Sequence, residues 1–93
     1  MEKTKTIVRI AGKEFSISSY DSEDYVRKVA ANVDRKIQEL YQATHLPGGQ
    51  LAVLTAISLA DDLTKSREEI RRLKQELNTA KDELERLRPY AKL

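Results

Sequence analysis

Hydrophobic residues recur at alternating intervals of three and four along the second half of the chain. From Ala56 the spacing continues to Leu87 without a slip, and no proline or glycine interrupts it before Pro89. This pattern is typical of a coiled-coil helix, in which hydrophobic a and d positions form a seam along one side. We expect the large residues of the seam to mediate oligomerisation: Leu59, Leu63, Ile70, Leu73, Leu77, Leu84 and Leu87.

Charged residues beside this seam predict the direction in which two helices pair. The g positions are acidic and the e positions are basic. In a parallel pair, each g residue faces the e residue five positions later in the partner, whereas an antiparallel pair sets like charges together. The sequence therefore predicts a parallel homodimer with attractive pairs throughout: Asp62 with Arg67, Glu69 with Lys74, Glu76 with Lys81 and Glu83 with Arg88.

Two short β-prone runs stand near the start of the chain. Residues 7–10 and 14–17 flank Ala11-Gly12-Lys13, and a three-residue loop with a central glycine predicts a β-hairpin. A lone hairpin is marginally stable in water, so it must pack against another element. Ile7, on the less buried face, indicates a further contact.

A helical pattern follows the hairpin, from about Glu23 to Gln42. Asp21 or Ser22 is suited to cap its N-terminus. The next apolar segment, residues 51–60, is hydrophobic almost all round and must be covered on more than one side. We expect the first helix and the hairpin to cover one side and the partner chain the other. The core stripe of the first helix comprises Val26, Val29, Ala30, Val33, Ile37 and Leu40.

These elements predict an α+β fold in which a small ββα head is followed by a long C-terminal coiled-coil helix. The head occupies residues 1–50 and the helix residues 51–88, its first part completing the head core and the rest forming the parallel coiled coil. Pro89 disfavours a helical conformation at the preceding residue, so residues 89–93 are expected to form a frayed tail. A head of this size is near the lower limit for an independent core, so we expect its stability to require the partner subunit.

Composition argues against catalysis. The chain contains no cysteine, its net charge is +2, and its single histidine, His45, lies in a loop, where a solvated turn residue is more plausible than a general base. Neither a phosphate-binding glycine loop nor metal-ligand spacing occurs. We therefore predict no enzymatic activity, no cofactor or metal, and no small-molecule substrate. The absence of a signal peptide or a span-length apolar run predicts a cytoplasmic protein without membrane contact.

A nucleic-acid partner is the first alternative, since a zipper invites comparison with basic-zipper transcription factors. Those proteins carry a basic region immediately before the zipper. Here apolar residues 51–60 hold that place, which excludes a basic-zipper function. Only diffuse phosphate contact through the basic residues of the head is left open.

Three segments together resemble the family of the bacterial cell division protein ZapA. They are residues 8–17, residues 25–37 and residues 51–63, and with the heptads they cover nearly the whole chain. The resemblance implies dimers that pair into tetramers, binding to the tubulin-like protein FtsZ, promotion of filament bundling, and stabilisation of the Z-ring at midcell. A general coiled-coil adaptor or a nucleoid-associated binding protein is the alternative function.

FtsZ filaments are acidic, as the resemblance implies, so basic residues of the head are the predicted contact. Each of them is also explained by solvation of the head alone. Two dimers joined through their coils in opposite directions would place heads at both ends. The predicted FtsZ-binding residues are Lys13, Arg27, Lys28, Arg35 and Lys36.

Overall fold

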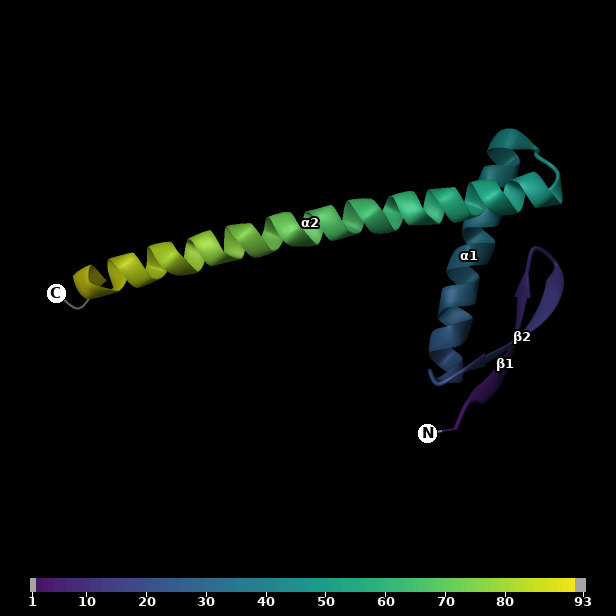
Figure 1. Ribbon diagram of the computed structural model, residues 1–93, viewed down its shortest axis with the longest axis horizontal. Helices are drawn as coiled ribbons and strands as arrows, with labels where there is room; N and C mark the ends of the chain where they lie inside the picture. The colour runs from purple at the N-terminus through teal and green to yellow at the C-terminus, as the bar shows by residue number, and fades with distance from the viewer. Residues whose placement is uncertain (1, 92–93) are drawn as a thin grey trace. The chain divides into compact units, whose positions relative to one another are not determined.

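The computed structural model describes residues 2–91, which form a β-hairpin followed by two helices (Figure 1). The elements are β1 (Thr4–Ile10), β2 (Lys13–Ser19), α1 (Glu23–Thr44) and α2 (Gly48–Ala91). This order confirms the predicted α+β fold. The chain divides into two units, Met1–Leu59 and Ala60–Leu93, which are described separately.

The hairpin of the first unit has a tighter loop than the sequence predicted. Lys13 belongs to β2 and pairs with Ile10, so the loop contains only Ala11 and Gly12. Their φ angles are 55° and 78°. Positive φ at both central residues is typical of the type I′ turn, whose twist matches that of the flanking strands. The backbone N–H of Ala11 donates a hydrogen bond of 2.9 Å to Oδ1 of Asp34, which ties the loop to α1.

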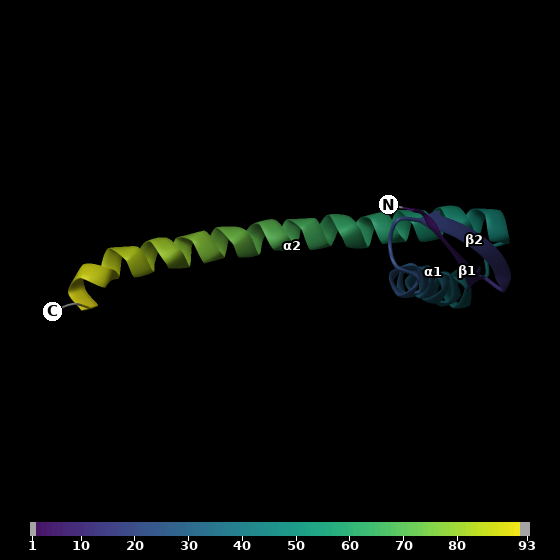
Figure 2. The ribbon, with the colours of Figure 1, turned by 90° about the horizontal axis from the view of Figure 1, so that it is seen from below.

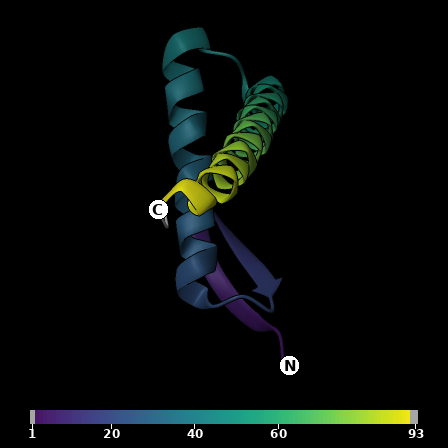
Figure 3. The same ribbon diagram turned by 90° about the vertical axis from the view of Figure 1, so that its left-hand side faces the viewer.

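The core of the first unit lies between β1 and α1. Val8 packs with Val26 and Ala30, and all three are buried. Ile10 and Ile17 pack against this cluster and are half-buried. Figure 3 shows the hairpin beside the N-terminal part of α1. Buried Thr6 and Val8 therefore alternate with exposed Lys5, Ile7 and Arg9 along β1.

Two apolar residues of the head, one of them in the predicted core stripe of α1, are exposed in the single chain. Phe15 lies opposite Val8 on the same face of the hairpin, yet it is 47% exposed, and Val29 of the α1 stripe is 43% exposed. The reason is that α1 packs mainly on β1, which leaves the inner face of β2 with little cover. The expectation that Val29 belongs to the core is thus wrong for the isolated chain.

The ends of α1 are fixed by local hydrogen bonds. Ser22 is the N-cap, and its Oγ accepts a hydrogen bond of 3.2 Å from the N–H of Tyr25. Glu23 and Asp24 follow in the first turn, where carboxylates interact favourably with the helix dipole. At the other end, His45 adopts a left-handed conformation and its N–H donates to the carbonyl of Tyr41. The helix therefore extends to Thr44, two residues beyond the predicted end.

Helix α2 is longer at both ends than predicted, and Figure 2 shows it as one continuous helix. It begins at Gly48 because the carbonyl of Pro47 accepts the first hydrogen bond, from the N–H of Leu51. It continues through Pro89 to Ala91, so the predicted end near residue 88 is wrong. A proline one turn from a helix end removes a single hydrogen bond and does not detach the residues after it. The remaining residues of the predicted tail, 92–93, lie outside the described residues.

The covered part of α2 in the first unit is its first two turns. Leu51 and Thr55 are buried, and Oγ1 of Thr55 donates to the carbonyl of Leu51 at 2.7 Å. Val53 and Ile57, on other sides of the same segment, are each 61% exposed. Within residues 2–91, none of the helices combines the length and hydrophobicity needed to cross a membrane.

Candidate interaction surfaces

The predicted seam forms an exposed apolar stripe along α2 in the second unit. Its side chains are exposed to between 50% and 69%. Such a stripe on an isolated helix is unfavourable in water, and a partner helix would remove it from solvent. Leu59, in the first unit, is half-buried. The exposed members are Leu63, Ile70, Leu73, Leu77, Leu84 and Leu87.

Three of the acidic g positions beside the seam, Glu69, Glu76 and Glu83, form ion pairs with arginines of the same helix. Nε of Arg72 donates to Glu69 at 3.2 Å, and its Nη1 donates to Glu76 at 2.7 Å. The hydrogen bond and charge of Glu69 and the charge of Glu76 raise the pKa of Arg72. By contrast, the e-position lysines, Lys74 and Lys81, make no ion pair with any other residue of the described range. The acidic g positions and the basic e positions therefore border the seam on its two sides. Lys74 and Lys81 make no ion pair within the described part of one chain.

The five basic residues predicted to bind FtsZ do not share one face of the head. Successive residues of a helix are turned by about 100°, so Lys28 and Arg35 lie within about 20° of each other, opposite the buried Val26 and Ala30. Arg27 and Lys36 lie about 180° apart on the two flanks of α1.

The local surroundings of these residues also differ. Arg27 pairs with Glu23 at 3.4 Å. Lys13 is exposed at the start of β2, Lys28 is exposed, and Lys36 is half-buried. The structure thus places Lys28 and Arg35 together and the other three predicted residues elsewhere on the head.

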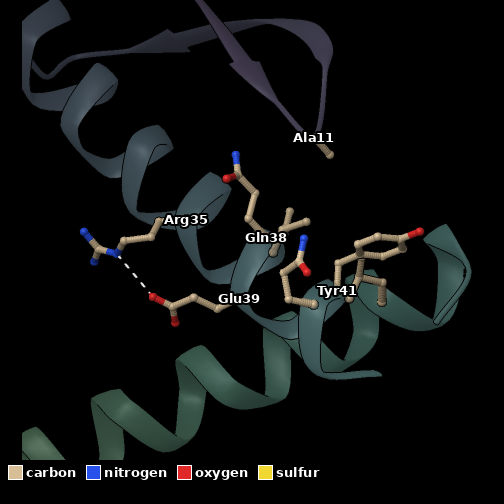
Figure 4. Close-up of a pocket in the computed structure, with 8 residues that line it drawn as sticks. Ala11, Arg35, Gln38, Glu39 and Tyr41 are labelled. Atoms are coloured by element: carbon tan, nitrogen blue, oxygen red, sulfur yellow. Dashed lines mark ion pairs between the residues drawn. The ribbon is translucent and has the colours of Figure 1, made fainter. Parts of the chain in front are cut away.

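Arg35 lines a groove of about 620 Å³ in the first unit (Figure 4). Its Nε lies 3.9 Å from a carboxylate oxygen of Glu39. The hairpin loop contributes Ala11, and α2 contributes Leu51. The other lining residues come from α1 and are Ile37, Gln38, Tyr41 and Gln42. The groove therefore joins a charged rim to apolar walls, and Lys13 is not part of it.

Sequence reasoning missed a basic residue on the hairpin, Arg9. Its guanidinium lies 3.7 Å from Glu14 and 3.3 Å from the carbonyl oxygen of Gly12. Together with Ile7 and Arg27 it lines a second hollow, of about 280 Å³, beside β1. The signal was present as a period-two alternation, since Lys5, Ile7 and Arg9 fall on the same face of β1.

His45 has a structural role at the end of α1. It forms the C-cap of the helix, is exposed, and its ring centroid lies 5.1 Å from that of Tyr41. Across residues 2–91, the side chains of histidine, aspartate and glutamate form no group suited to a metal ion.

Comparison with known proteins shows which family the chain belongs to. The sequence profile described as "Cell division protein ZapA" matches residues 7–89, which include nearly all of the hairpin, both helices and the seam. The chain belongs to the ZapA family.

Relatives named ZapA support this assignment. The ZapA of Halalkalibacterium halodurans is 43% identical over 76 residues, which are 81% of this chain and 84% of that protein. The ZapA of Bacillus subtilis is 38% identical over 77 residues, covering 82% and 91% of the two chains. The resemblance inferred from the sequence is therefore confirmed.

A solved structure shares the fold. It is described as a ZapA mutant dimer from Geobacillus stearothermophilus, and it superposes with a TM-score of 0.66 at 38% identity. The match covers 84% of this chain and 92% of the other. A relative with this fold is thus a dimer.

Proposed function

We propose that this chain is a non-enzymatic cell division protein that binds FtsZ filaments at midcell and joins neighbouring filaments. The observation that carries the proposal is the exposed seam of α2 in a member of the ZapA family. An apolar stripe of this length favours self-association, and a self-associating chain presents more than one copy of its head. Several heads on one body are what a crosslinker needs.

The proposed assembly is a parallel coiled-coil dimer, with a pair of dimers as the larger form. In a parallel dimer the two heads lie at the same end of the coil, and an opposed second dimer adds heads at the other end. With a rise of about 1.5 Å per residue, the 44 residues of α2 span about 66 Å. Linked weak sites then gain avidity without any strong single contact.

The proposed FtsZ contact uses basic residues of the head. Lys13 and Arg35 come from different elements, β2 and α1, and both are exposed. Within residues 2–91, the ion pair of Arg35 is a long, exposed one to Glu39, at 3.9 Å, so a carboxylate of the filament competes with it at little cost. Arg27, Lys28 and Lys36 are the further candidates from α1.

Co-sedimentation with FtsZ filaments tests this contact. The double variant Lys13→Glu and Arg35→Glu is expected to lose co-sedimentation while sedimentation equilibrium still shows the dimer. Arg71→Glu is the matched control, because it reverses an exposed charge outside the head and should leave co-sedimentation unchanged. Unchanged co-sedimentation of the double variant would remove Lys13 and Arg35 from the contact.

A parallel pull-down with duplex DNA separates this function from a nucleoid-associated one. At physiological salt the chain is expected to retain FtsZ and not DNA, since the five basic residues predicted from the sequence do not share one face of the head. Retention of DNA in preference to FtsZ would contradict the proposed function.

A further inference from the structure

One edge of the hairpin is unpaired. β1 pairs with β2 on one side, and no backbone hydrogen bond joins its other edge to any residue in the range 2–91. Antiparallel pairs alternate between hydrogen-bonded and non-hydrogen-bonded. A two-residue turn closes with a hydrogen bond between the residues that flank it, so Ile10 and Lys13 form a hydrogen-bonded pair. Counting back from it, the amides of Lys5, Ile7 and Arg9 point away from β2. β1 therefore offers a row of free donors and acceptors.

The side chains along this edge are basic, with one large apolar residue between them. Lys5, Ile7 and Arg9 alternate with the buried Thr6 and Val8, and Ile7 is 64% exposed. An extended chain lying along the edge would contact Lys5, then Ile7, then Arg9. These contacts are two residues apart, which is the side-chain period of a strand.

The flank of α1 completes a channel beside this edge. Arg27 and Ala31 of α1 face Ile7 and Arg9 across the hollow of about 280 Å³. A free strand edge next to a helix is the arrangement in which extended peptides add to a sheet, where main-chain hydrogen bonds supply affinity and side-chain contacts supply specificity. Arg27 brings a third positive charge to it.

The carboxylates near the channel are already engaged. Asp34, which also lines it, accepts hydrogen bonds from the N–H of Ala11 and from Gln38 at 2.8 Å. Glu14 lies 3.7 Å from Arg9, and Glu23 lies 3.4 Å from Arg27. These last two pairs are exposed, and exposed pairs exchange readily for another carboxylate.

The free edge could pair with β1 of a second copy of this chain or with a segment of another polypeptide, and charge favours the second. A second copy of β1 would set Lys5 and Arg9 against the same residues of its partner, and like charges on neighbouring strands are destabilising. An acidic segment would instead meet Lys5, Arg9 and Arg27 with opposite charge. We propose that the free edge of β1 binds an extended acidic segment of a partner polypeptide, which adds to the hairpin as a third strand. The proposal does not depend on FtsZ being that partner.

A labelled synthetic peptide tests the proposal with the full chain. The probe has the seven-residue length of β1 and alternates glutamate with threonine and valine. Fluorescence anisotropy is expected to show saturable binding. A peptide with lysine in place of glutamate, and one with every second amide N-methylated, should each bind at least about tenfold more weakly, because the first loses the charge contacts and the second the main-chain hydrogen bonds.

Two proline variants at the same rung of the hairpin form the matched pair. Ile7 and Ser16 lie opposite each other, and their amides point to opposite edges. Proline is tolerated on an edge strand where its missing N–H faces solvent. Ile7→Pro is expected to weaken peptide binding at least about tenfold, and Ser16→Pro to leave it unchanged. If circular dichroism shows that Ile7→Pro does not fold, Arg9→Gln with Arg27→Gln tests the same edge against Arg71→Gln.

The outcomes separate clearly. Loss of binding in Ile7→Pro or in the double arginine variant, with binding kept in the matched control, supports a third strand at this edge. Equal binding of the N-methylated peptide, or equal loss in both members of a matched pair, would overturn the proposal. So would a change of oligomeric state in Ile7→Pro without a change in peptide affinity, since a second copy would then occupy the edge.

Discussion

Replacing Leu77 by alanine removes apolar surface from the middle of the seam on α2. The side chain is 54% exposed in the single chain, so pairing has about half of its surface left to bury. Full burial of a leucine contributes about 1.5–3 kcal/mol, so each chain loses about 1 kcal/mol and a symmetric dimer about 2 kcal/mol. That difference raises the dissociation constant of the dimer about 30-fold. Leu77→Glu should weaken the dimer further, because it brings a carboxylate into an apolar seam.

Sedimentation equilibrium over a wide range of protein concentration measures this constant. Gln75→Ala is the matched control, since Gln75 lies two residues away at an outer heptad position and is exposed. The control should dissociate like the wild type. A dissociation constant of Leu77→Ala equal to that of the wild type, or an equal rise in Gln75→Ala, would refute the assignment of Leu77 to a buried seam.

Three further predictions concern the cap, the flanking charges and pH. Ser22→Ala should lower the free energy of unfolding by about 1 kcal/mol in urea titrations, because the first turn of α1 loses its capping oxygen; no change would mean that the cap contributes nothing. Glu76→Lys should weaken association at low salt and added Lys81→Glu should restore it, whereas failure to restore it would contradict the parallel register. The hydrogen bond and charge of Asp61 raise the pKa of Lys65 above its ordinary value of 10.5. This ion pair therefore stabilises the helix fully below pH 10.5, and its contribution is lost as the pH rises through the raised pKa of the folded state. Helical circular dichroism should accordingly fall more above pH 10.5 in the wild type than in Lys65→Gln, and identical curves would contradict this.

The hairpin and helices were predictable because their signals are local. Alternating side chains mark β1, and Ser22 with Glu23 marks the start of α1. The loop length was not predictable in the same way. A two-residue loop requires a left-handed conformation at Ala11, which alanine does not favour. Its N–H is held by Asp34, 23 residues away, and in the sequence Asp34 reads as an ordinary solvated charge.

Burial in the head depended on packing that the sequence pattern does not contain. Val29 and Phe15 belong to apolar faces, but α1 lies over β1 and leaves both of them more than 40% exposed. The basic residues show the same limit. Their spacing along α1 predicts their directions, yet only the position of β1 beside the helix shows that Arg27 and Arg9 line one hollow.

Disulfide crosslinking of single-cysteine variants tests the parallel dimer most directly, because the chain has no cysteine of its own. Leu87→Cys lies near one end of the seam and Leu59→Cys near the other. Only a parallel pair brings two copies of the same end position within the short distance that a disulfide spans. Under mild oxidation, Leu87→Cys alone should form covalent dimers rapidly. Crosslinks that appear only when Leu87→Cys and Leu59→Cys chains are mixed would show an antiparallel pair and contradict the account.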